Sequence, residues 1–549
     1  MRKILVVNLT RFGDLLQTSP TIVGLRENHP DAELVALVER NFADVARGLP
    51  AVDRVWELDL DRLGRMLIGE TGDGLRAAYR LVDDTVKALR DERFDLALNY
   101  SSSKMSAVLL RLIVAPDTRG WTMSADGHRL IAHPWSRLFA ASCLHRRQAP
   151  FNLVDYYKRV AGVAAGPERL FFEVPADARR WAADFLAGAG APPGAPLVAF
   201  QLGASRPVRR WPAAHFVALA RALHAAIGAR FLLCGGGGDR PVANEIAAAL
   251  GSLAIDACGR SSIAGLGALL ERADVLVTGD TGPMHMAVAV GTPVVALFFG
   301  PALPFDTGPY AADHVCLHAE VACAPCDHNV TCLEPFCRDT LAPAAVAEAV
   351  LARRAGDWQA LAAAAARWPA IAWYRTGFDA EGLADVSLLG ARPPGRAEGL
   401  RRAYRALWKA VLEGTAPRPA SAALPRDAAV LREVARLAAE GAGRALGVEA
   451  LAADACDLDA LEGAARRLEE LDARLFRLGA MHEAAALLVQ VFRFETENLE
   501  GEDVGALARA TRVVHEELAA RARLLAEMLE PAGAVRPAMS QGGDHASVG

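Results

Sequence analysis

The sequence has no large excess of charge of either sign. It contains 60 lysine and arginine residues against 65 aspartate and glutamate residues, which gives a formal net charge of -5 at pH 7. Proteins that bind nucleic acids in general present a strongly basic surface, so this balance argues against nucleic acid as a partner. Local basic sites for small anions remain compatible with it.

A long uninterrupted apolar run is also missing. The amino-terminal segment ILVVNL is followed at once by the polar TRFGD, which leaves too short an apolar core for a secretory signal. The most apolar stretch, residues 287–305, fits part of a strand-helix-strand unit better than a membrane span, because it is interrupted by Gly291, Pro293, Gly300 and Pro301. We expect a cytoplasmic protein, with peripheral contact at the inner membrane left open.

Cysteine is too sparse for a secreted disulfide scaffold, with nine residues in a chain of 549. Four cysteines nevertheless crowd into the segment CAPCDHNVTCLEPFC, with a spacing unlike that of bacterial ferredoxins. Four thiolates in a compact loop suit a tetrahedral Zn or Fe ion that holds the loop together. The candidate ligands of such a structural metal are Cys323, Cys326, Cys332 and Cys337, and free thiols or occasional disulfides are the alternative.

Strands and helices alternate along the first part of the chain, as in a parallel α/β domain. We expect buried strands at 4–9, 33–38 and 94–99 and helices at 14–28 and 75–93. A connector rich in glycine, alanine and proline follows near 166–195. A second series then begins, with LVAFQLG, RFLLCGG, VLVTGD and PVVALFFG as its strands. The economical architecture is two Rossmann-like domains, residues 1–165 and 190–350, that face one another across a cleft.

The composition changes near residue 356 to alanine, arginine, glutamate and leucine. Leucines recur there at helical spacing, for example at 461, 468, 471, 475 and 478, which predicts a helical hairpin or small bundle. We therefore expect an all-α extension over residues 356–530 and a disordered tail over 531–549. Core packing is the ordinary meaning of such leucine stripes.

The segment GDTGPMHMA, residues 279–287, joins two β-rich runs through a short helix. Pro283 suits a first helical turn and Gly291 a helix end. The free N–H groups at the start of such a helix can hold an anion at the carboxyl end of a parallel strand. Asp280 and His285 would then lie near a bound phosphate or sugar. The alternative is that Asp280 or Thr281 only caps the helix.

Three other segments place polar residues where a strand ends. In NLTRFGDLLQTSP, Asp14 either caps a helix or accepts a proton from a substrate hydroxyl in the cleft. In QLGASRPVRRWP, a turn that contains Ser205 leads to arginines that can bind a diphosphate or remain solvated, and these are Arg206, Arg209 and Arg210. In LLCGGGGDRPVANEI, the glycines allow close approach to a ligand, although no dinucleotide or Walker spacing is present, and Asp239 or Glu245 could reach a ribose.

Taken together, these segments resemble the bacterial heptosyltransferases of glycosyltransferase family 9. The matching motifs are RFGD, GAS followed by RRWP, the glycine turn after FLLC, and GDTGPMHMAVAVGTPVVALFFGP, in the same order and at similar separations. The resemblance covers residues 1–350 and is strongest over 279–301, and it leaves the helical extension unexplained. It implies a GT-B fold with an acceptor site in the first domain and a nucleotide-sugar site in the second.

In that family the donor is typically ADP-L-glycero-β-D-manno-heptose, the acceptor is an inner-core lipopolysaccharide sugar, and the anomeric configuration inverts. The resemblance makes Asp14 the general base and Asp280 a contact of the donor sugar. Arg209 stands where the family usually has a lysine that serves the phosphates, and Thr281 with Gly282 would meet the diphosphate. Ser205, Arg210, Asp239 and His285 complete the expected donor site, and Lys104 in SSSKMSA is the candidate acceptor contact.

The resemblance therefore implies an inverting glycosyltransferase that requires no cofactor for catalysis. Its acceptor would be a glycan, lipid-linked or protein-borne, and the helical extension could serve self-association or acceptor docking. Two alternatives stay open: another GT-B enzyme of nucleotide sugars, such as an epimerase, and an inactive GT-B scaffold or assembly protein. The joint presence of Asp14, Asp280 and the arginines argues against the scaffold, which has little need of them together.

Overall fold

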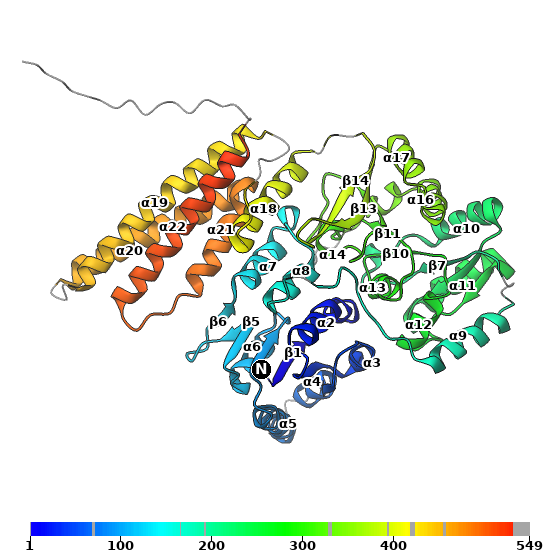
Figure 1. The fold of residues 1–549 in the computed structure, drawn as a ribbon, viewed down its shortest axis with the longest axis horizontal. Coiled ribbons are helices and arrows are strands. Elements are labelled where there is room, and N and C mark those ends of the chain that lie inside the picture. Colours follow the sequence, from blue (N-terminus) through cyan, green and yellow to red (C-terminus); the bar gives the residue numbers. More distant parts are fainter. Residues whose placement is uncertain are drawn as a thin grey trace, which may run out of the picture. The chain divides into compact units, whose positions relative to one another are not determined.

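The computed structural model describes residues 2–530 except 69–71, 165, 191–193, 328–331, 392, 394, 418–422 and 454–456. The chain divides into two compact units, Met1–Pro393 and Pro394–Gly549. The first unit holds two sheets with helices on their faces, and the second is helical (Figure 1).

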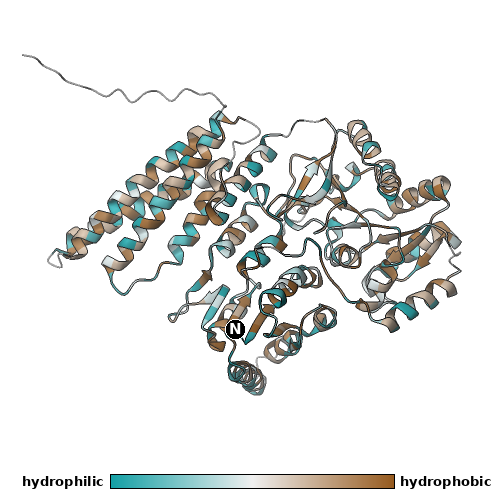
Figure 2. Cartoon of the chain, in the orientation of Figure 1, coloured by the Kyte–Doolittle hydropathy of each residue, from teal (hydrophilic) through white to brown (hydrophobic). Residues whose placement is uncertain are grey.

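The first sheet has six strands in the order β3-β2-β1-β4-β5-β6. Its parallel strands are β1 (Lys3–Asn8), β2 (Glu33–Glu39), β3 (Arg54–Leu58), β4 (Leu96–Asn99) and β5 (Asp117–Met123), and β6 (Arg129–Ala132) is antiparallel. The helices of this lobe are α1 (Phe12–Leu16), α2 (Ser19–Asn28), α3 (Ala43–Arg47), α4 (Leu60–Ile68), α5 (Gly72–Asp91), α6 (Lys104–Ile113), α7 (Pro134–Leu144) and α8 (Leu153–Val160). The central strands are apolar runs buried on both faces, as the sequence predicted, and they are brown in Figure 2.

The helix expected over residues 14–28 is in fact two helices, α1 and α2. Pro20 has no N–H to donate to the carbonyl oxygen of Leu16. The hydroxyl of Ser19 donates to that oxygen at 2.6 Å, and the hydroxyl of Thr18 donates to the oxygen of Leu15 at 2.6 Å. The break ends α1 after little more than one turn, so that the helix is a short platform for Asp14.

The second sheet has eight strands in the order β14-β13-β12-β11-β10-β7-β8-β9. Its parallel strands are β7 (Leu197–Gln201), β8 (Arg230–Cys234), β9 (Ala254–Asp256), β10 (Val275–Gly279), β11 (Val294–Phe298) and β12 (Val315–Ala319). The helices of this lobe are α9 (Ala176–Gly188), α10 (Ala213–Ile227), α11 (Arg240–Leu250), α12 (Ile263–Leu270), α13 (Gly282–Ala289), α14 (Pro304–Thr307), α15 (Cys337–Thr340), α16 (Pro343–Ala355) and α17 (Trp358–Arg367). The predicted strand-helix-strand unit around Asp280 is confirmed as β10-α13-β11.

The expected boundary of the helical extension at residue 356 is wrong. The second sheet continues through the antiparallel hairpin of β13 (Ile371–Phe378) and β14 (Ala384–Leu388), and the compact unit ends only at Pro393. The reason is local composition, because IAWYRTGF is rich in aromatic and β-branched residues although alanine and arginine surround it. Trp373 of this hairpin is fully buried opposite Leu317 of β12.

The second unit contains α18 (Arg396–Glu413), α19 (Pro425–Ala453), α20 (Leu458–Met481), α21 (Glu483–Glu497) and α22 (Val504–Met528). The predicted all-α character is confirmed, with α19 packed along α22 and α20 against both α19 and α21. The leucine stripes form the core, since Leu471, Leu475 and Leu518 are fully buried. The predicted disordered tail, residues 531–549, lies outside the described residues. Within the described ranges no helix is long and apolar enough to cross a bilayer.

Candidate active site

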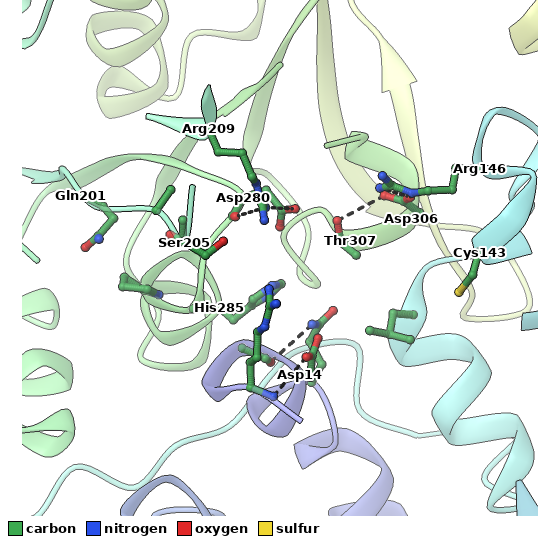
Figure 3. Close-up of a pocket in the computed structure, with 18 of the residues that line it drawn as sticks. Asp14, Cys143, Arg146, Gln201, Ser205, Arg209, Asp280, His285, Asp306 and Thr307 are labelled. Atoms are coloured by element: carbon green, nitrogen blue, oxygen red, sulfur yellow. Dashed lines mark hydrogen bonds and ion pairs between the residues drawn. The ribbon is translucent and has the colours of Figure 1, made fainter. Parts of the chain in front are cut away.

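A cavity of about 610 Å³ opens between the two lobes of the first unit. One wall comes from α1 and from the α7–α8 region, and the other from the loops that follow β7, β8, β10 and β11. Figure 3 shows Asp14 on the first side and Arg209, Asp280 and His285 on the second. The carboxyl ends of parallel strands therefore meet the cavity, which is where such sheets bind ligands.

Asp14 lies in the first turn of α1 and lines this cavity. One carboxylate oxygen accepts a hydrogen bond of 3.3 Å from the backbone N–H of Arg11. Burial raises the pKa of Asp14, and the hydrogen bonds from Arg11 and Thr10 lower it only in part, while the nearby charge of Asp280 raises it further. The carboxylate thus does both things that the sequence allowed: it supports the helix start and it faces the cavity.

The two lobes touch where α1 meets the start of α13. A Cβ atom on Gly13 would lie 3.0 Å from Cδ2 of His285 and 3.2 Å from Cα of Gly282. A Cβ atom on Gly282 would lie 2.2 Å from Cδ1 of Phe12. Because neither glycine has a Cβ atom, the two backbones approach closely and bring Asp14 to the loop that begins at Asp280.

The amino terminus of α13 carries no side-chain cap. Thr281 occupies the N-cap position, but its hydroxyl lies 3.2 Å from the hydroxyl of Thr278 instead of capping the helix. Asp280 is held by Arg209, whose Nη2 donates to the Asp280 carboxylate at 3.0 Å and to its carbonyl oxygen at 2.8 Å. The alternative that Asp280 or Thr281 serves only as a cap is therefore not what the structure shows, because α13 has no side-chain cap.

Asp239 organises the glycine loops of the second lobe. Its Oδ2 accepts a hydrogen bond of 2.9 Å from the N–H of Gly236, and a Cβ atom on Gly203 would lie 2.0 Å from that same oxygen. The carboxylate also lies 3.7 Å from Nη2 of Arg210. Arg210 turns back to donate two hydrogen bonds of 3.1 Å to the carbonyl oxygen of Ala204. Its charge therefore fixes the loop and lies away from the cavity wall.

The structure gathers most of the predicted site residues around one cavity. Those that line the cavity are Asp14, Ser205, Arg209, Asp239, Asp280, Thr281, Gly282 and His285. Four candidate residues do not line it, namely Lys104, Arg206, Arg210 and Glu245, and Lys104 is exposed at the start of α6. The roles assigned to all of these residues remain predictions.

Three buried polar atoms of cavity-lining residues have no hydrogen-bond partner within the described part of the chain: Nδ1 of His285, Oε1 of Gln17 and Oε1 of Gln201. Burial lowers the pKa of His285 to about 4, so its imidazole is neutral near pH 7. Sequence reasoning missed both glutamines. A signal for Gln17 was present, because it follows Asp14 by one helical turn and so shares its face.

A second group of residues missed from the sequence fixes the two lobes to one another. Arg146, just after α7, donates to Oδ2 of Asp306 at 2.8 and 2.5 Å and also to the carbonyl oxygen of Pro301. Behind it, Asp155 of α8 accepts from the hydroxyl of Tyr310 at 2.9 Å and from the N–H of Ala384 at 3.0 Å. Arg146 and Asp306 both line the cavity, with side chains that are each 12% exposed.

Cys143 of α7 also lines the cavity but is not suited to nucleophilic attack. The protein atoms around its sulphur raise the pKa of the thiol to about 12 although the residue as a whole is exposed, so the thiolate is scarce near pH 7. The cavity therefore offers carboxylates, a neutral imidazole and guanidinium groups. This combination fits proton removal and stabilisation of an anionic leaving group.

The four clustered cysteines lie near one another after β12, and all four are free thiols. The pKa of Cys326 is raised by its partial burial and by the neighbouring thiols of Cys323, Cys337 and Cys332. Among the described residues, no group of three or more histidine, cysteine, aspartate or glutamate side chains is arranged to hold a metal ion. Part of this loop, residues 328–331, lies outside the described residues, and the metal site remains a prediction.

Known proteins are similar to this chain in sequence and in fold. Residues 83–336 match the family model for glycosyltransferase family 9 (heptosyltransferase). Lipopolysaccharide heptosyltransferase 1 of Pseudomonas aeruginosa is 26% identical over 334 residues, which cover 61% of this chain and 88% of that protein. Lipopolysaccharide heptosyltransferase 3 of Escherichia coli is 26% identical over 295 residues, which cover 52% of this chain and 80% of that protein.

The fold also matches a solved structure. The glycosyltransferase family 9 protein of Veillonella parvula DSM 2008 superposes with a TM-score of 0.53 at 22% identity, over 65% of this chain and 98% of that one. The predicted fold class, two facing Rossmann-like lobes with a helical carboxyl-terminal region, is thereby confirmed. The family model, the relatives and the fold agree: residues 83–336 carry a glycosyltransferase family 9 domain, and the chain is a glycosyltransferase.

Proposed function

We propose that the chain transfers a heptose, or a closely related sugar, from an ADP-sugar to a hydroxyl group of an inner-core lipopolysaccharide acceptor, with inversion at the anomeric carbon. The observation that carries this proposal is the meeting of Asp14 and the Asp280 loop in one cavity. The names of the relatives, lipopolysaccharide heptosyltransferases, support the choice of donor and acceptor.

The proposed reaction is a single displacement. The acceptor oxygen forms a bond to the anomeric carbon while the bond from that carbon to the β-phosphate oxygen breaks, and the hydroxyl proton passes to Asp14. Arg209 and the first amide of α13 stabilise the charge that develops on the departing ADP. Asp280 contacts the donor sugar in this proposal, and its ion pair with Arg209 supports a role for the guanidinium in binding the diphosphate.

Arg209 is one of three arginines that line the cavity, with Arg11 and Arg146, and it is the one paired with Asp280. Its guanidinium has the fixed bidentate geometry that phosphate oxygens prefer, and Asp280 keeps it in place. The family usually has a lysine at this position. Arg209 preserves the positive charge, but its planar guanidinium presents N–H donors in a fixed plane, whereas a lysine presents a compact ammonium group.

The experiment that tests the proposal combines nucleotide binding with turnover. Calorimetry should show that ADP binds more tightly than UDP. The Asp14→Asn variant should bind ADP within about two-fold of the wild type, yet transfer the sugar about 100- to 10 000-fold more slowly, because it lacks the base. Asp31→Asn, an exposed carboxylate in a turn, is the matched control and should turn over normally.

Two results would contradict the proposal. Full activity in Asp14→Asn would show that Asp14 is not the base. Absence of both nucleotide binding and turnover in the wild type would favour an inactive scaffold. Mass measurement of products from a panel of nucleotide sugars identifies the donor and separates a transferase from an epimerase.

We also propose that the chain works at the cytoplasmic face of the inner membrane.

We further propose that the four clustered cysteines hold a structural Zn or Fe ion. Metal analysis of purified protein should then find about one metal ion per chain, and this ion should be lost in a Cys323→Ser, Cys326→Ser double variant. Equal metal content in both proteins would contradict the metal site.

A further inference from the structure

Gln17 is a buried polar residue whose hydrogen bonding is half complete. It is the C-cap residue of α1, one turn after Asp14, and it is 2% exposed. Its Nε2 donates to the carbonyl oxygen of Gly13 at 3.3 Å, whereas its Oε1 has no partner. Both Gln17 and Asp14 line the cavity.

The free end of this amide is chemically defined. The oxygen of Gly13 accepts from the backbone N–H of Gln17 at 3.1 Å as well as from Nε2. Only the nitrogen end of the side chain can donate to a carbonyl oxygen, so the unpartnered end is the acceptor oxygen. It requires a hydroxyl or N–H donor, and none of the described residues supplies one.

A buried acceptor without a donor is unfavourable, and it is rare in folded proteins. Methionine has nearly the same length and would fill this position without that penalty. The glutamine is therefore better explained by a ligand than by packing. Because this oxygen has almost no exposed surface in the structure, a ligand hydroxyl in the cavity beside Asp14 would complete its hydrogen bonding once the side chain turns toward the ligand.

We propose that Gln17 determines acceptor specificity: its Oε1 accepts a hydrogen bond from a hydroxyl of the acceptor sugar that neighbours the attacking hydroxyl. This inference rests on the proposed function, in which a sugar hydroxyl attacks beside Asp14. Residues three apart on one helix face have neighbouring side chains, so one sugar ring can reach both. Asp14 takes the proton of the attacking hydroxyl, and Gln17 orients the acceptor sugar ring that carries this hydroxyl.

The test compares the wild type with Gln17→Met, with heptose-free inner-core lipopolysaccharide as acceptor and ADP-heptose as donor. We expect kcat/KM for the acceptor to fall about 10- to 100-fold, because an acceptor hydroxyl loses its partner. Affinity for ADP, measured by calorimetry, should stay within about two-fold. Gln17→Leu serves as a second apolar variant if Gln17→Met does not accumulate as folded protein.

The matched control is Thr18→Val. Thr18 is fully buried in the same break between α1 and α2 and does not line the cavity. Its hydroxyl bonds to Leu15, so the variant perturbs the same helix end without changing the cavity wall. It should lower the unfolding temperature and leave kcat/KM for the acceptor unchanged.

Acceptor analogues that each lack one hydroxyl sharpen the assignment. The wild type should discriminate against one of them, and Gln17→Met should treat that analogue and the full acceptor alike. Unchanged kcat/KM in Gln17→Met, or unchanged discrimination, overturns the inference. If Gln17→Met is unchanged but Asp14→Asn is inactive in the same assay, only the inference about Gln17 fails and the proposed function stands. Absence of transfer by the wild type refutes both the inference and the proposed function.

Discussion

At the scale of single residues, the site depends on groups kept in unfavourable surroundings. Asp14 is a carboxylate whose pKa is raised mainly by burial, and His285 is an imidazole whose pKa is lowered to about 4 by burial. In both cases burial disfavours the charged form of the side chain, so the position costs folding free energy when that form is present. Such perturbed groups in one cavity are the ordinary sign of a catalytic site.

The first prediction concerns the pH dependence of stability. Because the folded state raises the pKa of Asp14, this group favours folding at low pH and loses that contribution as the pH rises through its folded pKa. Asp14→Asn should therefore unfold roughly 2–4 °C above the wild type at pH 8, and the difference should shrink towards pH 4. Thermal unfolding measured at several pH values checks this.

Asp31→Asn controls for the loss of an exposed carboxylate and should show no such pH-dependent gain. The acid limb of kcat/KM should likewise lie at a higher pH than an exposed carboxylate would give, because Asp14 must be ionised to act as a base. A gap in unfolding temperature that grows as the pH falls would contradict the account.

At the scale of elements, the site depends on how closely α1 approaches α13. Gly13 and Gly282 allow that approach, and Phe12 lies where a Cβ atom of residue 282 would be. The break between α1 and α2 leaves α1 as a short separate helix. The position of Asp14 is therefore set by packing across the lobes as well as by its own helix.

The second prediction follows from this packing. Gly282→Ala should force Phe12 and α1 away from α13 and lower the transfer rate about 10-fold or more, since small displacements at a reacting centre are costly. The double variant with Phe12→Ala should recover part of the rate, because the clash is removed. Initial rates and unfolding temperatures of the three variants measure the effect.

Gly188→Ala is the matched control, because a Cβ atom at that helical position meets nothing within 4 Å. Its rate should equal that of the wild type. An unaltered rate in Gly282→Ala would mean that the contact between the helices does not position the base.

At the scale of the whole molecule, all residues that line the cavity belong to the first unit. Its two sheets are joined through buried polar contacts, among them Arg146 with Asp306 and Asp155 with Tyr310. The second unit has its own core of buried leucines, including Leu471 and Leu518. Nucleotide binding should therefore be a property of the first unit.

The third prediction is that a chain ended after residue 393 binds ADP within about two-fold of the full chain. The cut falls at the boundary between compact units, so it removes no strand of either sheet. Calorimetry on both proteins tests this, with Asp14→Asn in the shorter chain to check that turnover has the same base. Loss of ADP binding in a folded shorter chain would contradict it.

The sequence predicted well what depends on neighbouring residues. The unit around Asp280 and the place of Asp14 follow from apolar periodicity and from helix-start signals, which are local. The pair of Arg146 with Asp306 could not be predicted, because 160 positions separate the partners. The same holds for the β13–β14 hairpin, whose place in the sheet is fixed by pairing with β12, and for Arg210, which a backbone carbonyl draws away from the cavity.

The central claim is that Asp14 on one side of the cavity and the proposed diphosphate site at Arg209 and α13 on the other carry out a single inverting displacement. The most direct test is the anomeric configuration of the product that forms from ADP-L-glycero-β-D-manno-heptose, measured by NMR as transfer proceeds. The account predicts an α-linked heptose in the first product detected. A β-linked product, which would require retention through a second displacement, would contradict it.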